Sequence, residues 1–185
     1  MSKSFLVWMS GSEGLGKVHL ITGAGKGKTT AAFGMAMRVA GHGLKVCVVQ
    51  FLKTGETTGE VLYARKAGGI EIAQFGTGWF VDPKHIAAGD RSCARDALRL
   101  ARDILTKGDC KMLVLDEVNV AVSFGLISSE DVLSLLRSRK EGTEIVLTGR
   151  NAPIEFIEYA DYVSIIESRK NPFDDGHAAR EGIEW

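Results

Sequence analysis

The sequence predicts a three-layer α/β protein in which helices cover both faces of an open, mostly parallel sheet. Six apolar runs alternate with helix-like segments along the 185 residues. The runs are continuously apolar, as expected for parallel strands that are buried on both faces. A glycine-rich turn that ends in a lysine lies between the first run and the first helix. Alternation of this kind implies right-handed crossovers within one sheet.

The strands and the first helices follow from these patterns. The six expected strands are residues 18–21, 45–52, 70–75, 112–115, 144–148 and 162–166. The first helix begins near Lys28, directly after the glycine-rich turn. Residues 53–69 are expected to form a loop with a short helix. Asp90 can cap a further helix, in which the apolar side chains from Ala94 to Leu105 follow helical spacing.

Two later helices are marked by the chemistry of their first turns. Ser128 and Asp131 resemble a capping box ahead of a run of valine and leucine. Pro153 suits the first turn of a helix that continues through Tyr159. We therefore expect one helix after residue 128 and one after residue 153.

The charge balance bears on the partners of the chain. Lys+Arg and Asp+Glu both total 23, so no overall field favours nucleic acid or a membrane. Arg91, Arg95, Arg99 and Arg102 could form a basic track for nucleic acid on one helix face. A solvated face with acidic partners nearby is the favoured interpretation. The sequence thus predicts neither a nucleic-acid nor a membrane partner.

Two features predict a cytoplasmic location. Cys47, Cys93 and Cys110 are scattered without a Cys-x-x-Cys pair, which is typical of a reducing compartment. Residues 5–9 are apolar, but they are too few to span a membrane and lack the layout of a secretion signal.

We expect an N-terminal arm, residues 1–16, ahead of one domain, residues 17–185. Residues 10–16 have the composition of a flexible joint. The arm is a disordered tail, a cloning remnant or a segment that docks on a partner subunit, and the sequence leaves these options open. Residues 170–185 are polar but end in aliphatic and aromatic side chains. They form either a loosely packed terminus or a tail that closes over the site.

The glycine-rich turn, residues 22–30, has the order of a phosphate-binding loop: strand, glycine turn, lysine, hydroxyl, helix. Its glycines allow backbone N–H groups to close around phosphate oxygens, and the helix N-terminus favours an anion. Lys28 adds a charge, and Thr29 offers an oxygen to magnesium. Thr22 stands where the usual pattern has a glycine, and Lys26 is a second cation in the loop.

Two further groups predict ligand contacts. Asp116 and Glu117 end an apolar strand, where carboxylates can hold magnesium or act as a base opposite the phosphate loop. Trp79 and Phe80 follow a Gly-x-Gly turn after another strand, where an α/β sheet presents its ligand loops. These rings form an apolar ligand surface or contribute to packing.

Together these segments resemble the P-loop ATP:corrinoid adenosyltransferases, whose fold is P-loop NTPase-like. The resemblance covers about residues 17–185, and the short phosphate loop is itself a trait of that family. It is carried by residues 22–34, 41–43, 49–53, 115–117, 147–150 and 182–184. The family transfers the 5′-deoxyadenosyl group of ATP to the cobalt of a reduced corrinoid and releases triphosphate, in adenosylcobalamin formation.

The resemblance also implies the site residues. Lys28, Thr29 and Glu117 would be catalytic, and the magnesium or manganese ligands would be Thr29 and Glu117, with Asp116 second. Lys26, Lys28 and the metal would neutralise charge on the leaving triphosphate. The implied ATP contacts are Gly23, Ala24, Gly25, Lys26, Gly27, Lys28, Thr29, Thr30, Arg38, Arg150, Lys170, Asn171, Phe173 and Gly176.

For the corrinoid, the resemblance implies contacts from Trp79 and Phe80. The family carries an aromatic-x-tryptophan pair in this loop, and here Val81 stands at the tryptophan position. Phe80 would substitute from the adjacent position. Apolar groups there displace the lower axial ligand and ease reduction to Co(I).

The implied partners are a second copy of the chain, as a homodimer, and a flavoprotein reductase that supplies electrons. Two other functions stay open. One is a generic P-loop NTPase or kinase that cleaves at the γ-phosphate, and the other is a non-catalytic nucleotide or corrinoid sensor. The product formed from ATP distinguishes them: triphosphate, ADP or none.

Overall fold

A computed structural model describes residues 14–55, 57–78 and 81–185. They form a six-stranded, wholly parallel sheet in the order β3-β2-β4-β5-β1-β6. The strands are β1 (Val18–Thr22), β2 (Val46–Phe51), β3 (Ile70–Phe75), β4 (Met112–Asp116), β5 (Glu144–Thr148) and β6 (Tyr162–Ile165). Each expected strand is present, with bounds within one residue of the prediction. The expected arm overlaps the described chain only at residues 14–16.

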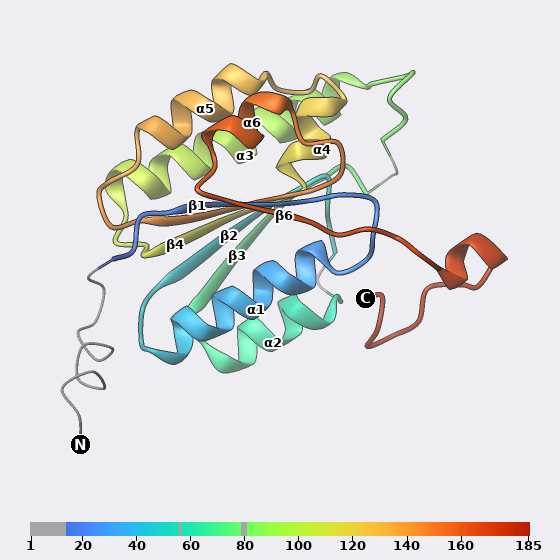
Figure 1. Cartoon of the computed structure of the whole chain (residues 1–185), viewed down its shortest axis with the longest axis horizontal. Coiled ribbons are helices and arrows are strands. Elements are labelled where there is room, and N and C mark those ends of the chain that lie inside the picture. The colour runs from blue at the N-terminus through green and yellow to red at the C-terminus, as the bar shows by residue number, and fades with distance from the viewer. Residues whose placement is uncertain (1–13, 56, 79–80) are drawn as a thin grey trace.

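Helices cover both faces of this sheet, which confirms the three-layer prediction (Figure 1). On one face lie α1 (Lys28–Gly41) and α2 (Gly59–Ala67). On the other lie α3 (Ala88–Lys107), α4 (Val118–Ser123), α5 (Ser129–Arg137) and α6 (Ile154–Tyr159). A short 3-10 helix, η3 (Pro172–Asp175), lies in the C-terminal tail. No helix within the described ranges is long and apolar enough to cross a membrane.

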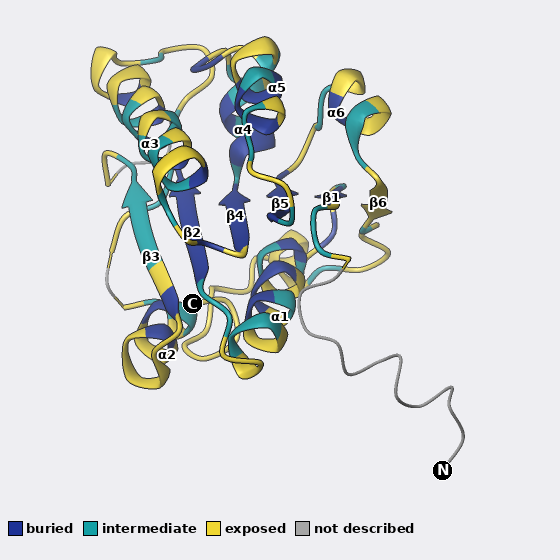
Figure 2. Ribbon diagram, turned by 90° about the vertical axis from the view of Figure 1, so that its left-hand side faces the viewer, coloured by how far each residue is buried: buried dark blue, intermediate teal, exposed yellow. Residues whose placement is uncertain are grey.

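Each face of the sheet has its own core. In β2, Val46 and Val48 pack toward α1 and α2, whereas Cys47, Val49 and Phe51 pack toward α3. All six β2 residues are therefore buried, which is why this strand is continuously apolar apart from Gln50 (Figure 2). Because these strands are parallel, the carboxyl ends of β1, β2, β4 and β5 lie at the same end of the sheet.

The helix starts test the capping predictions. The capping box of α5 is confirmed, since Ser128 Oγ accepts from Asp131 N–H (3.1 Å) and Asp131 accepts from Ser128 N–H (3.2 Å). The cap predicted for Asp90 is wrong, because α3 begins at Ala88 and Ala87 is its N-cap. Asp90 instead lies in the first turn, where it accepts from Ala87 N–H (3.0 Å) and from the Thr77 hydroxyl (2.9 Å).

Candidate active site

Three strand ends and one loop supply the site. The phosphate loop connects β1 to α1, and Lys53 follows β2. Asp116 ends β4, and Thr148 ends β5. Because all strands are parallel, side chains that are far apart in the chain meet at the carboxyl edge of the sheet, where open α/β sheets bind ligands.

Asp116 is the centre of this group and is completely buried. Its Oδ1 accepts from the hydroxyls of Thr29 (3.0 Å) and Thr148 (2.6 Å). Its Oδ2 accepts from Gln50 Nε2 (2.9 Å) and Lys53 Nζ (2.7 Å). Burial alone would raise the pKa of Asp116, but Lys53 and these hydrogen bonds hold that pKa below its ordinary value. Asp116 is therefore an ionised carboxylate whose four hydrogen bonds bring three strand ends and the loop together.

Glu117 lies next to this centre in a different environment. Its backbone is left-handed (φ 61°), and its N–H donates to Thr148 Oγ1 (3.0 Å). Burial, followed by the charge of Asp116, raises the pKa of Glu117 above its ordinary value. Within the described residues no group donates a hydrogen bond to its carboxylate. A β-carbon at Gly149 would lie 3.3 Å from Glu117 Oε2, so glycine leaves room for this side chain.

The phosphate loop is closed on itself in this structure. Lys28 is buried, and its Nζ donates to the carbonyl of Gly25 (2.6 Å). Burial lowers the pKa of Lys28. The N–H of Gly25 donates to the carbonyl of Ile166 (2.7 Å), in the chain that follows β6. Phosphate binding by Lys28 or by this N–H would therefore replace a bond within the protein.

The approach of that chain gives two loop glycines a role that the motif alone did not indicate. A β-carbon at Gly23 would lie 2.4 Å from the carbonyl oxygen of Ile166. One at Gly25 would lie 2.6 Å from the carbonyl oxygen of Glu167. Both distances are too short for real atoms, so the crossing of residues 166–167 over the loop requires glycine at both positions.

The C-terminal tail reaches the loop at its far end. Lys26 Nζ donates to the carbonyl of Ile183 (3.0 Å) and to Glu184 Oε1 (2.9 Å). Hydrogen bonds from Arg180 and Lys26 lower the pKa of Glu184 to about 2. The segment with η3 extends away from the body (Figure 1). The Phe173 side chain in it is exposed. The part of the tail that contacts the loop is thus residues 183–184.

The other predicted residues are spread more widely. Arg150 follows β5, and its charge acts on both Lys28 and Glu117. Arg38 lies in the last turn of α1, about 15 Å along the helix from Lys28. The structure does not bring Arg38 to the loop, and its contact with ATP stays a prediction. Lys170, Asn171 and Gly176 lie with Phe173 around η3, and Trp79 and Phe80 lie outside the described residues.

Three residues around Asp116 had no predicted role: Gln50, Lys53 and Thr148. Gln50 and Lys53 stand in the motif at residues 49–53, and Thr148 stands in the motif at 147–150. A polar side chain within or directly after a buried strand was the available signal. Gln50 is completely buried in an otherwise apolar strand. A buried polar side chain is costly unless it has a hydrogen-bond partner.

The donor set fits a divalent cation at Thr29 and Glu117. The Thr29 hydroxyl offers one oxygen to the ion. The Glu117 carboxylate offers another, because no group in the described chain donates a hydrogen bond to it. Asp116 does not fit as a direct ligand in this arrangement, because both its oxygens already accept two hydrogen bonds. It fits behind Thr29 as the acceptor that orients the hydroxyl. The described residues contain no group of three or more His, Cys, Asp or Glu side chains that could hold a metal.

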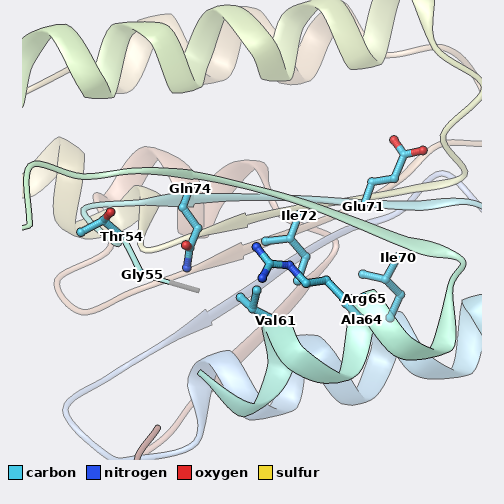
Figure 3. Close-up of a pocket in the computed structure, with 9 residues that line it drawn as sticks. All are labelled: Thr54, Gly55, Val61, Ala64, Arg65, Ile70, Glu71, Ile72 and Gln74. Carbon is cyan, nitrogen blue, oxygen red and sulfur yellow. The ribbon is translucent and has the colours of Figure 1, made fainter. Parts of the chain in front are cut away.

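A cavity of about 550 Å³ lies between α2 and the edge strand β3 (Figure 3). Val61 and Ala64 line it from the helix, and Ile70 and Ile72 line it from the strand. Gln74, also in its wall, donates to Gln50 Oε1 (2.9 Å). Since Gln50 in turn donates to Asp116, a hydrogen-bond chain connects this cavity to the site.

The parallel sheet, the phosphate loop and the acidic end of β4 define a nucleotide-binding protein of the P-loop class. Residues 14–185 match the model of the family described as ATP:corrinoid adenosyltransferase BtuR/CobO/CobP, and the chain belongs to this family. The family predicted from the motifs is therefore confirmed, and with it the class of enzyme.

Relatives of the same family align over most of the chain. A corrinoid adenosyltransferase from Sinorhizobium sp is 37% identical over 176 residues, covering 92% of this chain and 80% of that protein. The corrinoid adenosyltransferase of Escherichia coli (strain K12) is 35% identical over 170 residues, covering 92% and 86%. The corrinoid adenosyltransferase CobA of Salmonella typhimurium (strain LT2) is 35% identical over 173 residues, with the same coverage.

Proposed function

We propose that this chain transfers the 5′-deoxyadenosyl group of ATP to the Co(I) of a reduced corrinoid and releases triphosphate. Family membership over residues 14–185 carries the proposal. The geometry supports it, because the phosphate loop is tied through Thr29 to the buried Asp116. The electron pair of Co(I) forms the cobalt–carbon bond at the ribose C5′. The C5′–O bond breaks, its electrons leave with the triphosphate, and cobalt is formally oxidised from +1 to +3.

The protein's task in this reaction is to stabilise charge on the leaving triphosphate. Lys28 would exchange the Gly25 carbonyl for phosphate oxygens, so that a desolvated ammonium meets a full negative charge. Thr29 and Glu117 would hold magnesium, or manganese, which supplies further positive charge there. Asp116 would orient the Thr29 hydroxyl from behind.

For the corrinoid, Trp79 and Phe80 are the proposed apolar contacts. The described chain around them supports a ligand loop at this place. Thr77 is tied to Asp90 of α3 (2.9 Å), and Gly76 packs against the backbone that follows β2. Both anchors hold the start of the loop at the carboxyl edge of the sheet.

The test is an anaerobic reaction with ATP, magnesium and chemically reduced cobalamin. The expected result is cobalt–carbon absorption with one triphosphate released for each corrinoid alkylated. ADP as the product would instead indicate cleavage at the γ-phosphate, and binding without turnover would indicate a sensor. Either outcome would contradict the proposal.

The electron donor for Co(I) is proposed to be a flavoprotein reductase, and the reaction is placed in the cytoplasm. The scattered cysteines Cys47, Cys93 and Cys110, which form no Cys-x-x-Cys pair, are typical of a reducing compartment. Reduction of a bound corrinoid by a purified flavoprotein, followed by ATP-dependent alkylation, would test the donor.

A homodimer through the edge strand β6 is the proposed assembly. Ile165 is 65% exposed and Tyr162 56% exposed, and β6 pairs only with β1 among the described strands (Figure 2). An exposed apolar edge favours pairing with another strand. Ile165→Lys is therefore expected to give monomers in sedimentation velocity. Met37→Lys changes an exposed apolar side chain of α1 and should leave the dimer intact. Monomeric wild-type protein would contradict the assembly.

Deletion of residues 170–185 is expected to raise the KM for ATP strongly while the domain stays folded. The tail belongs to neither core cluster, and its contact with the loop passes through Lys26. A lid contributes to nucleotide closure but little to the core.

A single substitution refines this test. Glu184→Gln removes the charge that Lys26 and Arg180 share, and it should raise the KM for ATP several-fold with an unchanged melting temperature. Glu181→Gln, at a neighbouring exposed carboxylate, is the matched control.

Unfolding of the variant that lacks residues 170–185 would show that the tail is structural and not a lid.

A further inference from the structure

The ammonium of Lys53 lies between the Thr29 hydroxyl of the proposed metal site and the Asp116 carboxylate behind it. Its Nζ is 2.7 Å from Asp116 Oδ2 and 3.2 Å from Thr29 Oγ1. The Lys53 side chain is 28% exposed, and the Asp116 side chain is not exposed at all. Lys53 therefore provides the positive charge that the buried carboxylate needs, and it holds the hydroxyl of the phosphate loop against that carboxylate.

The backbone places Lys53 through two unusual features. Leu52 is left-handed (φ 59°), although it is not a glycine, and its N–H donates to the Phe75 carbonyl (2.8 Å). Gly76 packs directly on the same turn, since a β-carbon there would lie 2.8 Å from the carbonyl carbon of Lys53. A strained residue persists only where its surroundings hold it, so this turn is a built feature of the site.

The contacts of Thr29 show what Lys53 does to a metal. The hydroxyl donates its hydrogen to Asp116 and accepts from Lys53. Each carboxylate oxygen of Asp116 already accepts two hydrogen bonds, and Lys53 donates one of these four. In this structure the ammonium of Lys53 thus already occupies the Thr29–Asp116 pair.

We propose that Lys53 is a resident cation that keeps divalent metal off Thr29 and Asp116 until ATP arrives, so that metal binds only together with the triphosphate. This inference rests on the proposed metal-dependent function. Lys28, Lys53 and Arg150 act on Glu117, against one other carboxylate, that of Asp116. A metal ion without nucleotide would therefore meet three cations beside Glu117. The triphosphate brings negative charge and supplies the missing oxygen ligands.

The experiment uses full-length protein without nucleotide or corrinoid. Mn²⁺ binding is followed by electron paramagnetic resonance, and melting temperatures are measured with and without Mn²⁺. Lys53→Met keeps most of the length of the side chain but removes its charge. Lys53→Arg keeps a cation, and the double variant Lys53→Met with Asp116→Asn also removes the carboxylate. Lys107→Met is the matched control, because Lys107 forms an exposed pair with Asp103 (2.6 Å).

Lys53→Met should bind Mn²⁺ at least about tenfold more tightly than wild type, as a carboxylate freed of its counter-charge becomes a metal ligand. It should melt roughly 10 °C lower, because a buried charge loses its partner, and Mn²⁺ should restore most of that loss. Wild type, Lys53→Arg and Lys107→Met should show neither effect, and the double variant should neither bind Mn²⁺ more tightly than wild type nor be stabilised by it. If Lys53→Met does not fold alone, its refolding yield with and without Mn²⁺ replaces the melting measurement.

Tight Mn²⁺ binding by nucleotide-free wild type or by Lys53→Arg would overturn the inference. So would a Lys53→Met variant, or its refolding, that does not respond to Mn²⁺. Neither result would affect the proposed adenosyl transfer, because no nucleotide or corrinoid takes part in the measurement. Conversely, an enzyme that forms ADP would contradict the proposed function while leaving the exclusion of free metal intact.

Discussion

Lys28→Ala is expected to slow adenosyl transfer by about a hundredfold, which corresponds to about 3 kcal/mol of lost transition-state stabilisation. The ammonium of Lys28 is buried in the phosphate loop, where it donates to the Gly25 carbonyl (2.6 Å). Because burial already lowers the pKa of Lys28, its charge is poorly solvated and gains most when a triphosphate forms beside it. The measurement is kcat/KM for ATP with cobalamin reduced chemically, which removes any dependence on a reductase.

Lys107→Ala is the matched control, since Lys107 is an exposed lysine at the end of α3. It should retain wild-type kcat/KM. Circular dichroism should show both variants folded. Turnover of Lys28→Ala close to that of wild type would show that the loop is not the triphosphate site.

Gly23→Ala is expected to destabilise the protein by about 3 kcal/mol or more. Two effects act together at this position. Gly23 has φ 105°, which L side chains rarely adopt, and a β-carbon would lie 2.4 Å from the Ile166 carbonyl oxygen. That oxygen belongs to the backbone beside β6, so it cannot rotate away as a side chain could. Urea unfolding followed by far-UV circular dichroism measures the loss.

Gly34→Ala, in the neighbouring helix, is expected to change the free energy of unfolding in the opposite direction. Gly34 lies within α1, and nothing lies within 4 Å of an added β-carbon. Since glycine costs about 0.5–1 kcal/mol in a helix interior relative to alanine, this variant should be more stable than wild type. Equal stabilities of Gly23→Ala and wild type would mean that the chain after β6 does not cross the loop as described.

Much of the fold could be predicted because its signals are local. Burial on both faces requires a continuously apolar strand, and the run at residues 144–148, which is buried throughout, was predicted with the observed bounds. The run at 70–75 was also predicted with the observed bounds, although only Ile70 of this edge strand is buried. The capping box of Ser128 and Asp131 is likewise contained within four consecutive residues. The short helix α4 was not predicted, because its six residues follow β4 directly and share its apolar character. Asp90 was misplaced as a cap because two small residues ahead of it also joined the helix.

The sequence by itself determined the class of fold, the phosphate loop and the family, because each depends on residue types at short spacing. Only the tertiary structure decided how Asp116 is used. Its partners Thr29, Gln50 and Lys53 lie 87, 66 and 63 residues away along the chain. No local pattern encodes those contacts. They arise because parallel strands bring their carboxyl ends to the same end of the sheet. A charge that is buried there is stable only when it is paired and hydrogen-bonded.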